Sequence, residues 1–337
     1  MKTKPFLMFV APSLILMVVF IAVPLVIVGV QSFQRTQNVF QTIEQENCTP
    51  FNCTTTTRTV PRLDENGRPM TVTRWVGWQN YRALLQWDSV QRALSDAGRG
   101  FAGVTDVAFW GALRFTLMFT LLTLPLVLGV GLVLAFCVNA ITRQLRGPII
   151  FITLLPYIIT PVIGALSIRW LFIGDGIITA QLERLTGQNI SMFAQGWTIE
   201  LLMYFYRVWH VAPFAFVIFY AALQTVQSER IEAAKVDGAS RRQVITNVII
   251  PHLMPLIVFV SLIHLMDTYR VFDEIIGFRA EAFRISLQWL TFDFLTPDDT
   301  GNRSIGRASA SAILIMVGIV ILLIPPLRNT WKEQNQG

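Results

Sequence analysis

The segment Leu7–Val30 reads LMFVAPSLILMVVFIAVPLVIVGV, and it decides the class of fold. Ser13 interrupts its apolar character, while the Pro and Gly residues within it are tolerated in membrane helices. A helix needs about 20 mostly apolar residues to cross a bilayer, and an amphipathic soluble helix would show a polar face that is missing here. The apolar run exceeds the roughly 7–15 residues of a signal peptide and no small-residue cleavage site follows it. We therefore predict a retained membrane-spanning helix.

Five further segments of the same kind follow along the chain: Phe115–Val138, Ile149–Ile173, Leu201–Leu223, Pro251–Ile276 and Ala308–Leu327. Hydrophobic residues make up 53% of the chain and charged residues 14%, whereas soluble domains carry about 25% charge. This composition excludes a disordered chain and a small disulfide-stabilised module. It also disfavours a large soluble protein, because core helices there keep one polar face. We expect an all-α integral membrane protein with six transmembrane helices.

The net charge of +6 lies mainly in four places that six spans put on one side of the bilayer. The cations precede span one, link spans two and three, link spans four and five, and follow span six: Lys2, Lys4, Arg143, Arg146, Arg230, Lys235, Arg241, Arg242, Arg328 and Lys332. Short cytoplasmic loops carry an excess of Lys and Arg. Both termini and the loop 224–250 are therefore predicted to be cytoplasmic, and the basic charge indicates topology rather than a nucleic-acid partner.

The opposite side of the bilayer receives the long segment 34–106, which we predict to be a small, partly ordered extracytoplasmic insertion. Cys48 and Cys53 lie in it with four residues between them, and an oxidising compartment favours a disulfide over two free thiols. The predicted organisation is a first helix, this insertion, a core domain and a cytoplasmic tail, with bounds 1–33, 34–106, 107–327 and 328–337.

The cytoplasmic loop 228–243 reads SERIEAAKVDGASRRQ and carries the start and stop signals of two helices. Ser228 is a suitable N-cap, Gly238 is a suitable left-handed stop, and Ser240 with Gln243 forms a capping-box pattern. A plain linker has no need of two caps. The loop is therefore predicted to be a short helix, a glycine turn and a second helix that Pro251 bounds.

The residues of this loop leave two roles open. The small side chains of Ala233 and Ala234 let the groove of another protein approach closely. Lys235, Arg241 and Arg242 also permit a helix that lies on the lipid surface.

The spacing of this loop resembles a known signature. Binding-protein-dependent ABC importer permeases carry Glu-Ala-Ala, three residues, Gly, nine residues and Ile-x-Leu-Pro, and the matching residues here are Glu232, Ala233, Ala234, Gly238, Val248, Ile250 and Pro251. The resemblance covers spans two to six and implies the type I ABC importer permease fold. In that family the loop forms a coupling helix that docks into the ATPase subunit. The resemblance therefore assigns this role to Glu232, Ala233, Ala234, Gly238 and Pro251.

The same resemblance implies the partners of the chain. It implies a heterodimer with a second permease subunit, two cytoplasmic ABC ATPase subunits and an extracytoplasmic solute-binding protein, all at a bacterial inner membrane. The sequence has no Gly-x-x-x-x-Gly-Lys-Ser/Thr motif, no metal-ligand spacing and no Ser-His-Asp pattern. We therefore expect no enzyme activity and no cofactor on this chain, with ATP and Mg held by the ATPase subunits.

A second stretch, Tyr269 followed by Phe272-Asp273, is similar to the carbohydrate branch of the family, the maltose and glycerol-phosphate type of permease. The branch often continues with Gly-Gly-Pro, where this chain has Gly277-Phe278-Arg279. The resemblance implies a sugar or a sugar derivative as the transported molecule.

Ionisable and aromatic residues within the spans point to a polar path, because such groups are costly in a membrane and tend to face a cavity or a partner. The candidates are Tyr157, Arg207, His210, His264, Asp267, Tyr269, Arg270 and Asp273. A sugar needs both hydrogen-bonding groups and flat apolar surfaces, and this mixture supplies both. For each single residue, snorkelling to the interface or a simple ion pair, such as Asp267 with Arg207 or Arg270, is an equally good explanation.

Two alternative functions remain open from the sequence. Arginines in the outer half of the spans favour an anionic sugar, phosphorylated or sulfonated, because guanidinium forks suit oxyanions. An acid within a span, such as Asp267, also fits a self-contained secondary transporter driven by protons. A membrane enzyme has no candidate nucleophile or metal site here.

Overall fold

The computed structural model describes residues 3–49, 52–65, 67, 69–96, 100–299 and 301–334. The chain divides into two compact units. Unit 1 comprises Met1–Gly111 and Leu287–Val317, and unit 2 comprises Ala112–Ser286 and Gly318–Gly337. Each unit is described by itself.

Six helical segments of the described chain are long and apolar enough to cross a membrane: Met8–Gln31, Ala108–Ala140, Pro161–Thr186, Gly196–Leu223, Arg241–Thr268 and Ile305–Arg328. Five of them overlap most of a predicted span, so the prediction of a six-span helical membrane protein is confirmed. The third segment differs from the sequence prediction, for a reason that the structure makes clear below.

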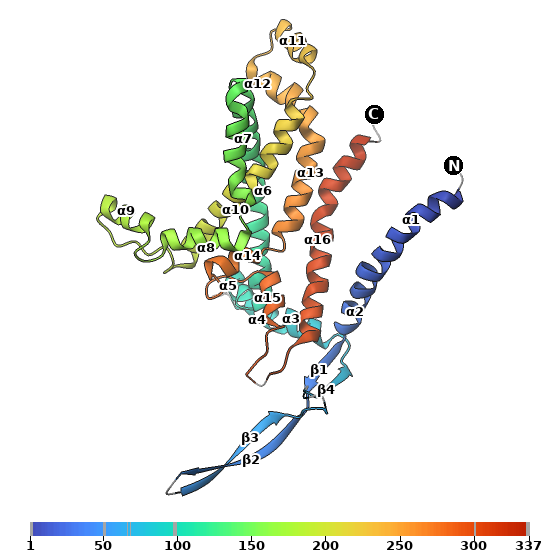
Figure 1. The fold of residues 1–337 in the computed structure, drawn as a ribbon, viewed down its shortest axis with the longest axis vertical. Helices are drawn as coiled ribbons and strands as arrows, with labels where there is room; N and C mark the ends of the chain where they lie inside the picture. The colour runs from blue at the N-terminus through green and yellow to red at the C-terminus, as the bar shows by residue number, and fades with distance from the viewer. Residues whose placement is uncertain are drawn as a thin grey trace. The chain divides into compact units, whose positions relative to one another are not determined.

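Unit 2 is a bundle of upright helices that ends in a short helical tip (Figure 1). Its helices, including the two shared with unit 1, are α6 (Ala108–Ala140), α7 (Arg143–Ile158), α8 (Pro161–Phe172), α9 (Ile177–Thr186), α10 (Gly196–Leu223), α11 (Ser228–Val236), α12 (Arg241–Val244), the π-helix η2 (Ile245–Ile249), α13 (Ile250–Thr268), α14 (Asp273–Phe278) and α16 (Ile305–Gln334). Phe216, Phe219 and Leu253 are fully buried at its core. Gly131 of α6 lies so close to α10 that a Cβ there would meet Ala215 at 2.7 Å, so a small residue is required.

The predicted span Ile149–Ile173 is wrong as a single helix. It breaks at Ile159 and Thr160, which have extended backbone angles, and α8 then leaves α7 at a steep angle (Figure 1). The cause is Pro161 at the first turn of α8, because the residue before a proline is driven out of the helical region. Hydropathy does not detect this break, since both halves are apolar.

Two other prolines, Pro24 and Pro251, do not break their helices, because a π-helical turn precedes each of them. The π-helical segments η1 (Val18–Ala22) and η2 (Ile245–Ile249) stand just before Pro24 and Pro251. A proline has no N–H and clashes with the preceding turn, and a wider π turn there relieves this conflict. Pro251 therefore does not end the second loop helix as predicted; the chain stays helical from Arg241 to Thr268.

Unit 1 carries strands that the sequence analysis did not predict. Its elements are α1 (Thr3–Met17), η1, α2 (Val23–Gln31), β1 (Gln34–Asn38), β2 (Phe40–Thr49), β3 (Asn52–Pro61), β4 (Thr71–Trp75), α3 (Gln79–Leu85), α4 (Trp87–Ser95), α5 (Gly100–Thr105), α15 (Leu287–Asp293) and the first part of α16. β1 pairs with β4 and β2 with β3, both antiparallel, and the β2–β3 hairpin extends away from the first pair (Figure 1). A small core of Tyr81, Leu84 and Ala310 holds α3 against α16.

Candidate functional site

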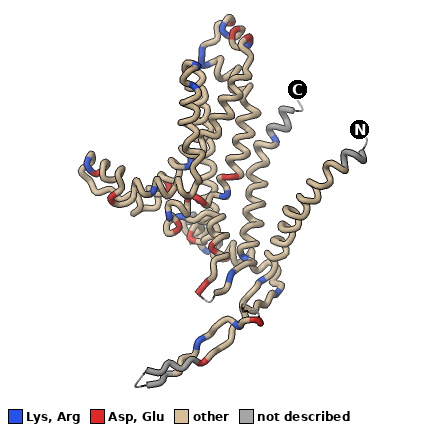
Figure 2. Tube along the Cα trace, viewed as in Figure 1, with Lys and Arg blue, Asp and Glu red and all other residues tan. Residues whose placement is uncertain are grey.

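A polar cavity of about 560 Å³ lies within unit 2, between α7, α8, α10, α13 and the start of α14. Seven of the eight predicted pathway residues line it: Tyr157, Arg207, His210, His264, Asp267, Arg270 and Asp273. In Figure 2 charges of unit 2 lie near α14, on α9 and at the α11–α12 end, with long uncharged stretches of helix between α14 and that end. The sequence pattern therefore identified side chains that the fold brings to one place.

Arg207 of α10 is the electrostatic centre of this cavity. Its guanidinium is buried; Nη1 donates to Oε1 of Glu274 at 2.8 Å, and Nη2 donates to the Asp267 carboxylate and to Thr268 Oγ1, the latter at 3.3 Å. Glu274 is 1% exposed, whereas the Asp267 side chain is 59% exposed and faces the cavity. Arg207 is therefore tied to one buried and one accessible carboxylate.

Glu274 is a partner of Arg207 that the sequence analysis did not name. It lies one position after Asp273, in the first turn of α14, where acidic side chains suit the helix dipole. The signal was a second carboxylate directly after Asp273, at the end of an apolar span. Because Arg207 is buried, an acid had to lie close to it, and Glu274 supplies that partner.

Two histidines line the cavity, His210 from α10 and His264 from α13, and each has one ring nitrogen within hydrogen-bond distance of a neighbouring group. His264 Nε2 lies 3.1 Å from Thr123 Oγ1, and His210 Nε2 lies 2.9 Å from the carbonyl oxygen of Ile159. The Nδ1 atom of each ring is buried and has no hydrogen-bond partner among the described residues. Both histidines therefore contribute to the cavity wall, while this nitrogen of each ring stays closed off from solvent.

The break between α7 and α8 forms part of the cavity wall. Breaking a helix frees backbone carbonyl groups at the end of its first part, and the Ile159 carbonyl accepts from His210 Nε2 of α10. Tyr206 Oη, also of α10, donates to Pro161 O in the first turn of α8 at 2.7 Å. Tyr157, the last aromatic residue of α7, stacks on Phe214 with ring centroids 5.5 Å apart. The wall thus offers a flat aromatic surface beside exposed polar groups.

Arg270 and Asp273 also line the cavity. Arg270 is exposed, and no described carboxylate lies within 4 Å of its guanidinium. Burial, together with the neighbouring Glu274 and Asp267 carboxylates, raises the pKa of the Asp273 carboxyl.

Tyr269 is not part of the cavity. It is buried, and its hydroxyl packs against Gly318 of α16, where a Cβ would collide with it. Tyr269 still has helical backbone angles at the end of α13, and residues two apart on a helix do not share a face, so Tyr269 lies on a different face from Asp267.

The loop 228–243, predicted as two capped helices, is confirmed in its main features. α11 is followed by Gly238 in a left-handed conformation (φ +79°), and Ser240 and Gln243 form a capping box at α12. The first cap differs from the prediction. The N-cap residue of α11 is Gln227 and not Ser228, and its side chain makes no capping hydrogen bond.

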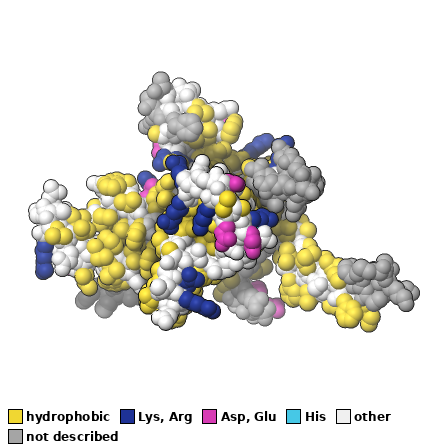
Figure 3. Space-filling view, turned by 90° about the horizontal axis from the view of Figure 1, so that it is seen from above, with side chains coloured by type: hydrophobic (Ala, Val, Ile, Leu, Met, Phe, Trp, Pro, Cys, Tyr) yellow, Lys and Arg dark blue, Asp and Glu magenta, His cyan; other side chains and the backbone are white. Residues whose placement is uncertain are grey.

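Most residues of α11 are exposed. None of its nine residues is buried, Glu232 and Ala233 are exposed, and Val236 is 87% exposed. Figure 3, which looks onto this end of the molecule, shows acidic and basic side chains together at the tip. An isolated helix of this length is marginal in water, so α11 has the properties of an element that is completed by another protein.

The backbones of Cys48 and Cys53 pair directly across the β2–β3 hairpin. Their side chains lie outside the described residues, so the disulfide stays a prediction. Peptide mapping of the protein purified without reductant should recover a Cys48–Cys53 cross-linked peptide, with Cys137 alkylated as an internal control. Alkylation of both Cys48 and Cys53 before any reduction would contradict the bridge.

Groups that hold a metal or perform catalysis are not evident in the described part of the chain, where no three His, Cys, Asp or Glu side chains cluster as metal ligands. Six apolar helices, a polar cavity within unit 2 and an exposed helical tip are the features of a multi-pass membrane transport protein. The sequence matches the family described as "Binding-protein-dependent transport system inner membrane component" over residues 100–325. The chain belongs to this family of ABC importer permeases.

Curated relatives cover most of the chain. It is 24% identical to the sn-glycerol-3-phosphate transport system permease protein UgpA of Rhizobium meliloti (strain 1021), over 76% of this chain and 88% of the relative. It is 28% identical to the probable ABC transporter permease protein YesP of Bacillus subtilis (strain 168), over 77% and 80%. It is 24% identical to the diacetylchitobiose uptake system permease protein DasB of Streptomyces coelicolor, over 78% and 75%.

The fold is also that of a solved permease. A chain of the bacterial ABC transporter involved in the import of the acidic polysaccharide alginate superposes with a TM-score of 0.60 at 20% identity, covering 73% of this chain and 88% of that chain. The predicted permease fold is therefore confirmed.

Proposed function

We propose that this chain is the transmembrane permease subunit of an ATP-driven importer that moves a sugar or a sugar derivative into the cytoplasm. The observation that carries the proposal is the exposed α11 helix, with its left-handed Gly238, on a six-span chain that holds a polar cavity. The cavity offers hydroxyl-binding groups beside the aromatic face of Tyr157. Two relatives are named for glycerol-3-phosphate and diacetylchitobiose transport, which supports this class of substrate.

The proposed mechanism is alternating access. ATP binding closes two separate ATPase subunits, α11 moves with them, and the cavity turns outward to receive substrate from a solute-binding protein; ATP hydrolysis resets it. ATP and Mg are held by the ATPase subunits, and this chain has no catalytic role. A second permease subunit completes the pore as a heterodimer, and the basic loops put both termini in the cytoplasm. A neighbouring structure in complex with a substrate-bound periplasmic protein supports the binding-protein partner.

The charges around the cavity favour a neutral substrate over an anionic one. Two guanidinium groups, of Arg207 and Arg270, and three carboxylates, of Asp267, Asp273 and Glu274, lie in or next to the cavity, so acidic groups outnumber basic ones. Arg207 is already shared between two of these acids. The anionic-sugar alternative depends on Arg270, whose guanidinium has no described carboxylate partner within 4 Å.

Uptake of charged and neutral glycosides by the reconstituted importer separates the two substrate classes. We expect neutral glycosides to be transported, and we expect Arg270→Ala to change their uptake by less than about fivefold, as for a residue that contributes under about 1 kcal/mol. If only anionic sugars are imported and Arg270→Ala abolishes their uptake, the anionic alternative holds instead.

The source of energy tests the proposal against a secondary transporter. Sealed vesicles with the complete complex should take up substrate with ATP and not with a proton gradient alone. Uptake driven by a proton gradient in vesicles that lack any ATPase subunit would overturn the proposed function.

A further inference from the structure

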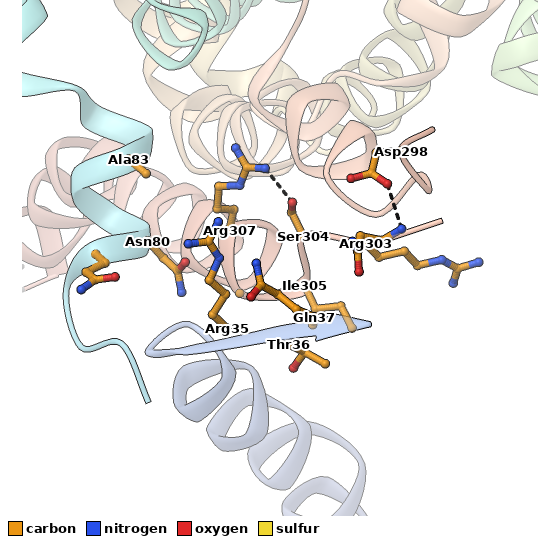
Figure 4. A pocket seen from close by; sticks show the side chains of 13 residues that line it. Arg35, Thr36, Gln37, Asn80, Ala83, Asp298, Arg303, Ser304, Ile305 and Arg307 are labelled. Carbon is orange, nitrogen blue, oxygen red and sulfur yellow. Dashed lines mark hydrogen bonds between the residues drawn. The ribbon is translucent and has the colours of Figure 1, made fainter. Parts of the chain in front are cut away.

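Unit 1 contains a second cavity, of about 370 Å³, that the proposed transport path does not use. It lies between β1, α3 and the start of α16 (Figure 4), and we call it the Arg35–Arg307 pocket. Its lining is polar, with guanidinium, amide and hydroxyl groups from these three elements and from the loop that precedes α16.

The walls of this pocket are fixed by hydrogen bonds between distant parts of the chain. Buried Asn80 of α3 donates through Nδ2 to the carbonyl oxygens of Ser32 and Gln34, at 2.8 and 2.9 Å. Asn302 Oδ1 accepts from the Asn38 N–H of β1 at 2.7 Å. Gly306 allows α16 to begin directly against β1, because a Cβ there would collide with Gln34 O. The pocket is therefore a built feature and not a gap between loosely placed loops.

Positive charge dominates the pocket. Arg35, Arg303 and Arg307 line it, whereas Asp298 is its one acidic lining residue and already accepts from the Asn302 N–H at 2.9 Å. Figure 4 shows Arg303 extending away from the other labelled side chains. In the part of unit 1 that the structure describes, no carboxylate lies within 4 Å of Arg35 or Arg307.

Arg307 is held in place without an acidic partner. Its Nη2 donates to Ser304 Oγ at 2.7 Å, and its guanidinium lies 5.1 Å from the centroid of the Phe294 ring. These contacts order the side chain while leaving other guanidinium N–H groups available. A planar group that is ordered in advance loses less entropy when it binds a carboxylate in the two-pronged manner.

We propose that the Arg35–Arg307 pocket is a docking site for a carboxylate side chain of the extracytoplasmic solute-binding protein. This proposal rests on the proposed function, which puts 34–106 and the residues before α16 on the side where that protein arrives. The charge of the pocket is complementary to an Asp or Glu, and Arg is enriched at protein interfaces. Oppositely charged surfaces speed encounter and fix the orientation of two proteins.

The exposure of the arginines favours a protein over a free anion. Arg35 and Arg307 are exposed, and solvent and salt screen the attraction of exposed guanidinium groups for a small ion. A protein partner that covers the mouth of the pocket removes water from the pair and strengthens it. The carboxylate is then held by two arginines in a pocket whose walls are fixed by the hydrogen bonds of Asn80 and Asn302.

The test measures ATPase activity of the complete importer in nanodiscs, as a function of the concentration of a purified, substrate-loaded binding protein that stimulates the wild type. Arg35→Gln combined with Arg307→Gln should raise the half-saturating concentration at least about tenfold with the maximal rate unchanged. It should also weaken the dependence of that concentration on salt. Arg82→Gln, on the exposed face of α3 outside the pocket, is the matched control and should behave as the wild type.

The outcomes separate the two proposals. If no binding protein stimulates the wild-type importer, the proposed function fails. If stimulation occurs and the double variant keeps the wild-type half-saturation, the docking proposal alone is overturned. Competition by millimolar glucuronate or inorganic phosphate that disappears in the double variant, with the binding-protein affinity unchanged, would show a free-anion site and would also overturn it.

Discussion

Replacing Glu274 with alanine is expected to lower the free energy of unfolding by about 3–5 kcal/mol, because it leaves the buried guanidinium of Arg207 without its buried partner. The cost is high because Glu274 is 1% exposed and no water replaces it readily. Chemical or thermal unfolding of the purified complex, followed for this chain, measures the effect.

Two further variants define the cause. Asp267→Asn removes the partner of Arg207 that is 59% exposed, so we expect a loss well below that of Glu274→Ala. The double variant Arg207→Met, Glu274→Met removes both buried charges and should recover most of the stability. Equal losses for Glu274→Ala and the double variant would show that lost packing, and not an unpaired charge, is responsible.

Changes in the coupling loop are expected to separate ATP hydrolysis from transport. Glu232→Arg reverses an exposed charge on α11, and Gly238→Val puts a β-branched residue at φ +79°, where it is strained by about 1–2 kcal/mol. Each should lower uptake by at least about tenfold while basal ATPase activity and assembly persist, as for the loss of an interface hot spot.

The control for Gly238 is a second glycine in the same conformation. Gly187 ends α9 with φ +66° and, like Gly238, has open space where a side chain would go. Gly187→Val therefore introduces the same strain outside the coupling loop and should leave uptake nearly unchanged. If both valine variants lose uptake equally, the effect is strain in the chain and the coupling role of Gly238 is not supported.

The class of fold was largely predictable because a helix that crosses a bilayer must be apolar along its length, and this can be seen in the sequence without knowing how the helices pack. Long uncharged segments such as Leu7–Val30 are visible in the sequence, and most predicted spans match helices of the structure. The third span was not predictable from hydropathy alone. The pair Thr160-Pro161 carried the information, since a residue before proline leaves the helical region.

The candidate site was predictable as a set of residues and not as a set of contacts. Ionisable side chains within apolar spans converge because each avoids lipid, and this places His210, His264 and Arg207 around one cavity. Which acid neutralises Arg207 depends on how α14 turns back after α13 ends, and no local pattern encodes that turn. Tyr269 faces α16 instead because it follows Asp267 by two residues on a helical backbone and therefore lies on a different face.

The most direct measurement of the central claim is cross-linking from α11 in the assembled complex. Val236→Cys, in a background with Cys137→Ser, places a thiol at a position that is 87% exposed; Leu185→Cys, on α9, places one at a position that is 82% exposed. A short thiol-to-amine reagent should join the Val236→Cys variant to an ATPase subunit, with a yield that changes when ATP is added, and should not join Leu185→Cys to it. An ATPase cross-link from Leu185→Cys and none from Val236→Cys would contradict the coupling role of α11.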